Sequence, residues 1–348
     1  MDTTTKQPNN PQQGEKETNG LDMLDEVIEK LSRHVDHLIE VERNKIRELF
    51  QGLGVALITP FKKDFSVDVE ALERIVNHVI DNGADFLVAL GTTSEAPTLT
   101  PEEKDLVINT IIKANANRLP IMLGMGGNNT QAVIEAIKAQ DFTGDRSIIK
   151  SILSVVPYYN KPNQRGMKAH FEAIADASPL PVVVYNVPGR VGVNLQAATC
   201  VELAKHPNII AVKEASGNLQ QIMEILRDKP YKFKVLSGDD GITYPLMALG
   251  ATGVISVAAN AYTEPFSRMM KAQKEGRVEE ALDLHYTMLR MNQLIFADGN
   301  PAGIKCLMHH MGLCENVLRL PLVPVNEKVE ADIIEEGIYL FGKQAIKQ

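Results

Sequence analysis

Eight short apolar runs alternate with helix-like stretches along most of the chain, and this alternation limits the folds open to it. Continuous apolar strands separated by helices indicate a parallel sheet whose outer face is covered by those helices. Eight such units within residues 51–276 match the size of a (β/α)8 TIM barrel, which we predict for this part of the chain. The apolar runs are residues 55–58, 86–90, 121–125, 152–156, 182–185, 209–213, 234–237 and 253–257.

A doubly wound open sheet is the alternative α/β architecture. It is disfavoured because no G-x-G-x-x-G pattern follows the first apolar run. Residues 277–348 show helical patterns interrupted by Gly312, Pro321 and Pro324, so we predict a C-terminal helical domain appended to the barrel.

The first 50 residues divide into two parts. Residues 1–20 contain no apolar residue after Met1 and are predicted to be a disordered tail. Residues 21–50 are predicted to form an amphipathic helical extension, because apolar residues there alternate in spacings of four and three. This seam fits a short oligomerising helix or a helix packed on its own domain, and we favour the second because Glu42 interrupts it after barely two heptads. The seam consists of Leu24, Ile28, Leu31, Val35 and Leu38.

Charge and cysteine content exclude several classes of protein. The 348 residues carry 36 Lys+Arg against 44 Asp+Glu, a net charge of −8, which argues against a nucleic-acid or membrane-surface partner. The three cysteines form no C-x-x-C pair and cannot make a disulfide framework. No apolar run approaches the roughly 18 residues needed to cross a bilayer. We therefore expect a cytoplasmic globular enzyme.

Lys213 is the most informative candidate for chemistry, since barrel active sites lie at the carboxyl ends of the strands. It directly follows the apolar residues 209–212, so its amine is expected at the barrel interior, where burial favours the neutral, nucleophilic form. That arrangement suits a Schiff base with a ketone. The alternative is a structural lysine paired with a carboxylate, although the neighbouring Glu214 should point to the opposite face of the strand.

Other polar residues follow the predicted strands. Tyr159 and Tyr185 can relay protons if a hydroxyl of Thr92 or Thr93 links them, and otherwise serve packing alone. The turn at residues 91–93 can present backbone N–H groups to a carboxylate. Arg190 can bind a second carboxylate through two parallel hydrogen bonds, or is an ordinary surface arginine.

The sequence predicts neither a metal site nor a cofactor. His34 with His37, and His309 with His310, lack accompanying ligands and are interpreted as solvated helix faces. The glycine-rich residues 124–130 lack the G-K-[ST] of a phosphate loop. The carboxylates of residues 239–240 either line the site or cap the next helix.

Seven motifs between Gly52 and Pro324 resemble those of the pyruvate-dependent class I aldolases, and most closely the dihydrodipicolinate synthase family among them. The motifs, in chain order, are GVALITPF, GTTSEAPTL, VVPYYNKP, YNVPGRVGVN, AVKEASGN, LSGDDG and GVISVAAN. The resemblance does not cover residues 1–50. It implies a lyase that joins pyruvate to L-aspartate 4-semialdehyde, giving 4-hydroxy-tetrahydrodipicolinate for lysine and diaminopimelate biosynthesis.

The resemblance also implies a role for each matching residue. The substrate pyruvate forms a Schiff base on Lys213, and its carboxylate is held by Thr92 and Thr93, after which the enamine attacks the aldehyde and cyclisation with loss of water follows. Because the second tyrosine of the family's pair enters the neighbouring subunit's site, a homodimer is the minimum active unit, and a homotetramer is common. The implied catalytic residues are Lys213, Tyr185, Tyr159 and Thr92, and the implied substrate-binding residues are Thr93, Arg190, Gly238 and Ile255.

Two alternative functions use the same fold. An N-acetylneuraminate lyase or another 2-keto-acid aldolase of the superfamily would form the same Schiff base, but the sialic-acid lyases typically lack an arginine at the position of Arg190. A catalytically silent scaffold would have no need of Lys213, Tyr185, Tyr159 and Thr92 together.

The chain departs from the family pattern at three places. Ser94 replaces a usual glycine, Val191 replaces a usual threonine, and residues 144–150 form a longer segment that could alter the loop near Tyr159. In addition, relatives inhibited by lysine carry an acidic residue at the position of Ala132 and a histidine at that of Lys104. Their absence predicts weak or absent inhibition by lysine.

Overall fold

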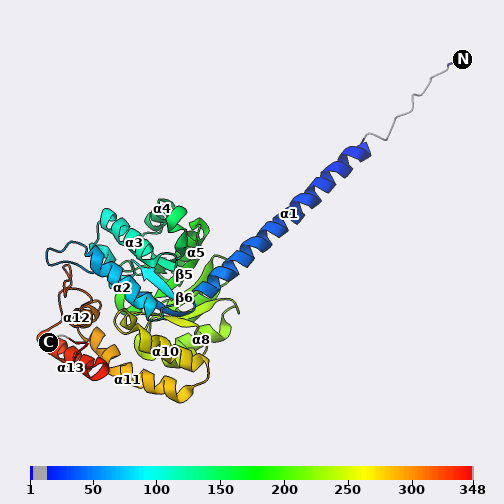
Figure 1. Cartoon of the computed structure of the whole chain (residues 1–348). Helices are drawn as coiled ribbons and strands as arrows, with labels where there is room; N and C mark the ends of the chain where they lie inside the picture. The colour runs from blue at the N-terminus through cyan, green and yellow to red at the C-terminus, as the bar shows by residue number, and fades with distance from the viewer. Residues whose placement is uncertain (3–13, 347–348) are drawn as a thin grey trace. The chain divides into compact units, whose positions relative to one another are not determined.

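The eight apolar runs form a closed barrel of parallel strands in the computed structural model, which describes residues 1–2 and 14–346 (Figure 1). The strands follow the order of the chain around the barrel, β1 pairing with both β2 and β8. The predicted TIM barrel is therefore confirmed. The strands are β1 (Gly52–Ala56), β2 (Phe86–Ala89), β3 (Ile121–Gly124), β4 (Ile149–Val155), β5 (Val182–Asn186), β6 (Ile209–Glu214), β7 (Lys234–Ser237) and β8 (Gly253–Ser256).

The first strand begins three residues before the apolar run that predicts it, because two of its residues are glycines. Gly54 lies opposite Phe86 of β2, and a Cβ at Gly54 would lie 2.1 Å from that ring. A glycine in the strand thus makes room for an aromatic ring on the neighbouring strand. A hydrophobicity pattern does not identify such a glycine as part of a strand.

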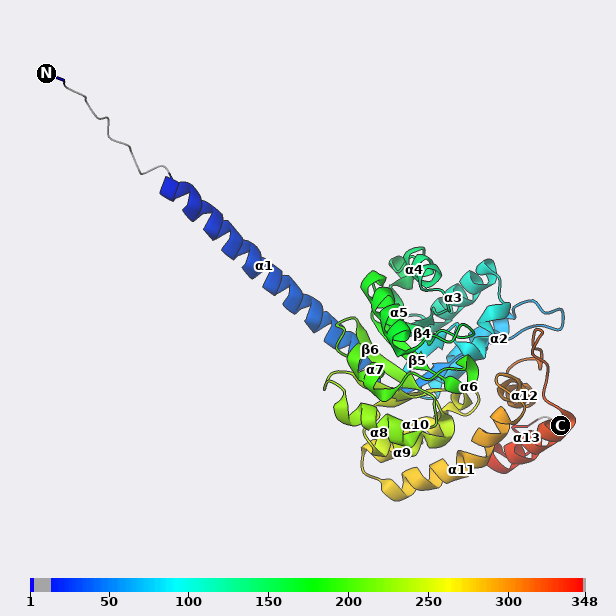
Figure 2. The same ribbon diagram turned by 180° about the vertical axis from the view of Figure 1, so that it is seen from behind.

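Helices follow the strands and cover the outer face of the barrel (Figures 1 and 2). Many begin at a residue whose side chain accepts a hydrogen bond from the first turn, such as Thr100, which forms a reciprocal capping box with Glu103. The α-helices of the barrel region are α2 (Val69–Asp81), α3 (Pro101–Asn115), α4 (Thr130–Lys138), α5 (Gln164–Ala177), α6 (Pro188–Val191), α7 (Ala197–Leu203), α8 (Leu219–Asp228), α9 (Thr243–Ala248) and α10 (Thr263–Lys274). Short 3-10 helices are η1 (Thr92–Ser94), η2 (Ala96–Thr98), η3 (Gly144–Ile148), η4 (Asp240–Ile242) and η5 (Ala258–Asn260).

The C-terminal region consists of α11 (Val278–Ala297), α12 (Ala302–His310) and α13 (Glu327–Phe341), which pack against one another (Figure 2). They share one apolar core with the barrel, in which Leu53 of β1 and Ile304 of α12 are both fully buried. The chain from Ile46 onward is accordingly one compact unit, so the helices predicted over 277–348 have no separate core.

Residues Met1–Lys45 form a unit of their own. The helix α1 (Gly14–Leu49) starts earlier than residue 21, where the sequence placed the helical extension, and includes the good helix formers Glu15, Lys16 and Glu17. Residues 3–13 of the predicted disordered tail lie outside the described residues. Each side chain of the apolar seam, from Leu24 to Leu38, is more than half exposed. None of the described helices combines the length and the apolar character that crossing a bilayer requires.

Candidate active site

Lys213 lies next to the end of β6 and is 5% exposed. It pairs in register with Tyr185 of β5, so both side chains stand on the same face of the sheet. The Nζ atom of Lys213 is 4.1 Å from the centroid of the Tyr185 ring. Within the part of the chain that the structure describes, no carboxylate forms an ion pair with Lys213. The interpretation of Lys213 as a structural, carboxylate-paired lysine therefore finds no support in the structure.

The neighbouring Glu214 points the other way, as predicted. Its buried carboxylate accepts hydrogen bonds from the Asn186 side chain, at 3.1 Å to each oxygen, from the Ser216 backbone at 2.8 Å, and from Gln221 of α8 at 3.3 Å. Burial raises the pKa of Glu214, and these donors oppose the rise. Lys213 and Glu214, adjacent in β6, thus point to opposite faces of the strand.

Thr92 and Thr93 begin η1, directly after β2. Thr93 is buried, and its Oγ1 accepts a hydrogen bond of 3.1 Å from the side chain of Asn300. Ser94, which replaces the usual glycine, donates its hydroxyl proton to the Gly91 carbonyl at 2.7 Å. The serine therefore closes the turn locally and adds no free hydroxyl to the site.

Arg190 lies in the short helix α6, with its side chain exposed. Its Nη2 donates to the backbone carbonyl of Asn300 at 3.2 Å. Asn300 therefore contacts both predicted carboxylate-binding positions, Arg190 through its backbone and Thr93 through its side chain. Sequence reasoning missed this residue, and the only available signal was the tripeptide Gly299-Asn300-Pro301 in a segment assigned to helices.

Gly238 and Ile255 are also adjacent to this region. A Cβ at Gly238 would lie 3.1 Å from Cε of Lys213 and 2.7 Å from Cβ of Ala215, so glycine leaves the lysine the space it occupies. Ile255 is buried on β8, paired with Gly54.

A cavity of about 840 Å³ opens at this end of the barrel. Thr92, Tyr185, Arg190 and Asn300 line it, and its wall continues along α3 and α4. Val191, the second departure from the family pattern, lines it as well. Lys213, Thr93, Gly238 and Ile255 are not part of its lining, and Lys213 adjoins it through the Tyr185 ring.

Tyr159 is the predicted residue that the structure does not bring to the others. Its side chain is 88% exposed, and its backbone has a left-handed φ of 72°. The loop itself is fixed, because the Asn160 side chain donates to the Asn128 carbonyl at 2.9 Å, and Asn128 donates to the Tyr158 carbonyl at 3.2 Å. Tyr159 is thus presented outward from an anchored loop.

The longer segment at 144–150 lies at the other end of β4 from this loop. Residues Gly144–Ile148 form η3, and the strand Ile149–Val155 separates them from Tyr159. Arg146 ties the segment to α3 through an ion pair of 3.0 Å with Asp105. The structure therefore gives this segment no contact with the tyrosine loop.

The carboxylates of Asp239 and Asp240 accept hydrogen bonds from backbone N–H groups. Asp239 accepts from the Gly241 N–H at 2.9 Å, and Asp240 accepts from the Val257 and Ala258 N–H groups at 3.0 Å each. Burial raises the pKa of Asp240 to about 6. Asp239 therefore caps the next helix, as the capping interpretation expected, whereas Asp240 instead ties η4 to the residues that follow β8.

Comparison with known protein families shows to which family the residues of this site belong. The model of the dihydrodipicolinate synthetase family matches residues 49–335. This chain belongs to that family. The match begins after nearly all of α1, so the N-terminal unit is an addition to the family domain.

Curated members of the family are similar over nearly their whole length. The 4-hydroxy-tetrahydrodipicolinate synthase of Parabacteroides distasonis is 54% identical over 275 residues, covering 79% of this chain and 91% of the relative. That of Phocaeicola vulgatus is 52% identical over 295 residues, covering 83% and 98%. A solved dihydrodipicolinate synthase from Aquifex aeolicus superposes with a TM-score of 0.79 at 38% identity, covering 86% of this chain and all of that one.

Proposed function

We propose that the chain condenses pyruvate with L-aspartate 4-semialdehyde to give 4-hydroxy-tetrahydrodipicolinate, as the names of its family relatives indicate for them. The observation that carries the proposal is the buried Lys213 amine against the Tyr185 ring, beside a cavity lined by Thr92 and Arg190. A buried lysine free of carboxylate partners suits nucleophilic attack on a ketone.

The first half of the reaction joins pyruvate to the protein. The Lys213 amine attacks the ketone carbon, and loss of one water gives the Schiff base. The hydroxyls and backbone of Thr92 and Thr93 hold the pyruvate carboxylate, while the Schiff base draws electrons from the methyl group. Loss of a methyl proton then gives the enamine. Tyr185, Thr92 and Tyr159 carry the protons in these steps.

The second half forms the ring. The enamine carbon attacks the aldehyde, which becomes the hydroxyl of the product, while the Arg190 guanidinium holds the semialdehyde carboxylate. The amino group of the semialdehyde then attacks the imine carbon and displaces the Lys213 amine. One water leaves overall, and Lys213 is regenerated. No cofactor is required by this sequence of steps.

Reductive trapping tests the nucleophile. Borohydride treatment in the presence of pyruvate is expected to add one reduced pyruvate per chain, located on Lys213 by peptide mass spectrometry. Lys213→Ala should lose both the adduct and turnover in an assay coupled to the next reductase through NADPH. Lys150→Ala, a lysine of β4, is the matched control and should retain both. A wild-type chain without an adduct would leave only the scaffold hypothesis.

Arg190 separates the synthase from its sister aldolases. Arg190→Ala should weaken kcat/KM for the semialdehyde by about 10- to 150-fold, the value of one charge-assisted hydrogen-bonding group, with pyruvate trapping unchanged. If the wild type forms the pyruvate adduct but does not turn over the semialdehyde, the protein is instead another 2-keto-acid aldolase of the superfamily.

We further propose that Tyr159 completes the site of a second subunit, because its own chain holds it 88% exposed on an anchored loop. The active unit is then at least a dimer, in the form of a tetramer as is common in the family, working in the cytoplasm. Mixing Tyr159→Phe with Lys213→Ala tests this: a mixed dimer has one site with both Lys213 and a partner's Tyr159. Recovered turnover is expected. Mixtures as inactive as the two variants alone would show that Tyr159 acts within its own chain, and full activity of Tyr159→Phe alone would show that its hydroxyl takes no part in the reaction.

A further inference from the structure

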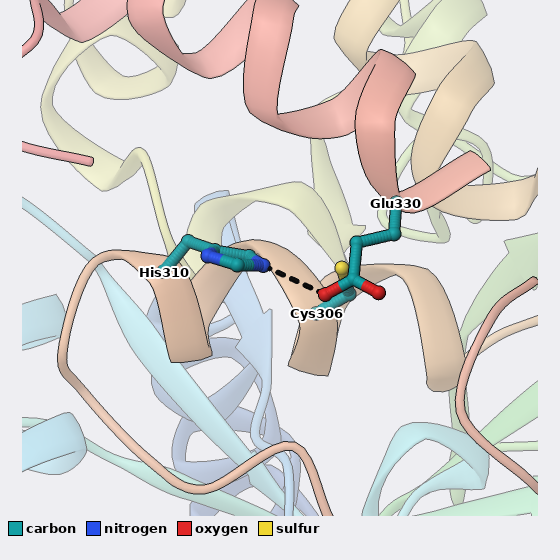
Figure 3. A group of neighbouring side chains, drawn as sticks. All are labelled: Cys306, His310 and Glu330. Atoms are coloured by element: carbon teal, nitrogen blue, oxygen red, sulfur yellow. Dashed lines mark hydrogen bonds and ion pairs between the residues drawn. The ribbon is translucent and has the colours of Figure 1, made fainter. Parts of the chain in front are cut away.

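Three side chains with metal-binding atoms converge on the C-terminal helices, outside the cavity described above (Figure 3). Cys306 and His310 stand one turn apart on α12, and Glu330 projects from the first turns of α13. One ligand atom from each lies within 4.8 Å of the other two, and Nε2 of His310 is 2.9 Å from Oε1 of Glu330. Cys306 is fully buried, and His310 is 9% exposed.

The burial of His310 overturns its interpretation as part of a solvated helix face. Residues four apart on a helix share one face, which places Cys306 and His310 together. The packing of α13 on α12 then covers that face and supplies the carboxylate. The third ligand is distant in the sequence, so a search for closely spaced ligands could not find it.

The donor set suits one class of ion. A sulfur, an imidazole nitrogen and a carboxylate oxygen are the ligands of Zn²⁺, with one position left for water. Zinc–ligand lengths of about 2.0–2.3 Å put the donor atoms of a tetrahedral site roughly 3.3–3.6 Å apart. The His310 Nε2–Glu330 Oε1 distance of 2.9 Å is shorter than that range, and the Cys306 sulfur lies within 4.8 Å of the other two ligand atoms, so metal binding requires all three side chains to adjust.

Charge balance supports the same assignment. A thiolate and a carboxylate neutralise a divalent cation, so the occupied site carries no net charge in a mostly buried place. We propose that Cys306, His310 and Glu330 form a binding site for a zinc-class divalent ion that joins α12 to α13.

Proton release accompanies binding. Burial and the nearby Glu330 raise the pKa of the Cys306 thiol to about 12, so the metal-free thiol is protonated. The metal must displace that proton to form the metal–sulfur bond, and binding therefore weakens as the pH falls.

The position of the site points to a stabilising ion. Cys306 lies one turn beyond the start of α12, the helix that follows Asn300 and also carries the buried Lys305. An ion here fixes α13 to the helix beside the cavity without contacting Lys213 or Tyr185. Occupancy is expected to raise the melting temperature and to leave pyruvate trapping unchanged.

Cobalt provides the probe, because a bound thiolate gives Co²⁺ a charge-transfer absorption in the near ultraviolet that water or carboxylate ligands do not. Full-length protein is freed of metal with a chelator and titrated with Co²⁺, then with Zn²⁺ in competition. The expected result is one equivalent of thiolate-bound Co²⁺ per chain, displaced by Zn²⁺. A titration without the thiolate band would overturn the proposal and leave an ordinary histidine–glutamate hydrogen bond.

Variants assign the ligands. Loss of an outer-shell partner alone weakens metal sites by about 10–100-fold, so Cys306→Ser and Glu330→Gln should each weaken binding at least about 100-fold. Cys314→Ser and His309→Gln, which change neighbouring residues of the same types outside the cluster, are the controls and should bind normally. If Cys306→Ser does not fold, the partly exposed Glu330→Gln still decides the question. Wild-type affinity in Glu330→Gln, or loss of the band in Cys314→Ser, would overturn the assignment.

Discussion

Lys305 and Glu95 form an ion pair in which neither side chain has any exposed surface. Glu95 belongs to the loop of the two site threonines, and Lys305 belongs to α12, 210 residues later. The lysine also donates to the Val317 carbonyl at 3.0 Å, and the second carboxylate oxygen accepts from the Arg319 backbone at 3.0 Å. The loop that carries Thr92 and Thr93 is therefore fastened to the C-terminal region through a buried charge.

Removal of one partner tests the importance of this pair for folding. Lys305→Met leaves the Glu95 carboxylate buried without its cation, which should lower the free energy of unfolding by about 3–5 kcal/mol. The double variant Glu95→Gln with Lys305→Met removes both charges and should recover most of that loss. Urea unfolding at a fixed protein concentration measures the free energy of unfolding of the wild type, the single variant and the double variant. A loss below about 1 kcal/mol in the single variant would show that water reaches the pair.

Asn300 should matter for pyruvate more than for the semialdehyde. Asn300→Ala removes the side-chain hydrogen bond to Thr93 but keeps the backbone carbonyl that accepts from Arg190. We expect the KM for pyruvate to rise by about 5- to 10-fold, in line with about 1 kcal/mol for one neutral hydrogen bond, with a smaller change for the semialdehyde. Equal effects on both substrates in steady-state kinetics would mean that the whole segment moves.

Asp240 should make the protein less stable at neutral pH than at mildly acidic pH. Its pKa rises from 3.8 to about 6 on folding, so the folded state binds the proton more tightly than the unfolded chain does. Its ionisation therefore opposes folding, increasingly between about pH 4 and 6 and fully above 6, by up to about 3 kcal/mol. Asp240→Asn, which keeps an acceptor for the Val257 and Ala258 N–H groups, should raise the melting temperature at pH 8 but not at pH 4. An equal shift at both pH values would contradict this origin.

Lysine is expected to inhibit weakly or not at all. Lys104 and Ala132 both line the cavity, so an amino acid there meets an ammonium and lacks a carboxylate at residue 132. The two acidic residues in the lining are already paired, Glu95 with Lys305 and Asp105 with Arg146. Half-inhibition at micromolar L-lysine in the coupled assay would refute the prediction.

Deletion of residues 1–45 should leave turnover within about twofold of wild type, because every proposed site residue lies in the compact unit that begins at Ile46. The same protein reports on the apolar seam of α1. Light scattering should give an unchanged number of subunits if the helix packs on its own domain, and fewer subunits if the helix joins them. Loss of turnover with the number of subunits unchanged would give α1 a part in catalysis.

The barrel was predictable because each parallel strand contains or overlaps a short apolar run, which is buried and can be recognised in the sequence without knowledge of the neighbouring strands. Lys213 was predictable for the same reason, since it ends such a run. Asn300 was not: it lies 207 residues from Thr93, and nothing local marks a contact made by chain packing. His310 was misjudged on similar grounds, because the helix that covers it comes later in the chain.

Lys213 and Glu214 also determine how β6 can align. Side chains alternate along a strand, so a slip of one residue would turn the carboxylate into the barrel and the ammonium toward α8. Glu214 would then lose the hydrogen bonds that it accepts from Asn186, Ser216 and Gln221. Each buried donor left without an acceptor would lower the stability of the fold. The outward-facing Glu214 thus fixes the strand register that places Lys213 inside the barrel. The misaligned pairing is disfavoured during folding, before any substrate is bound.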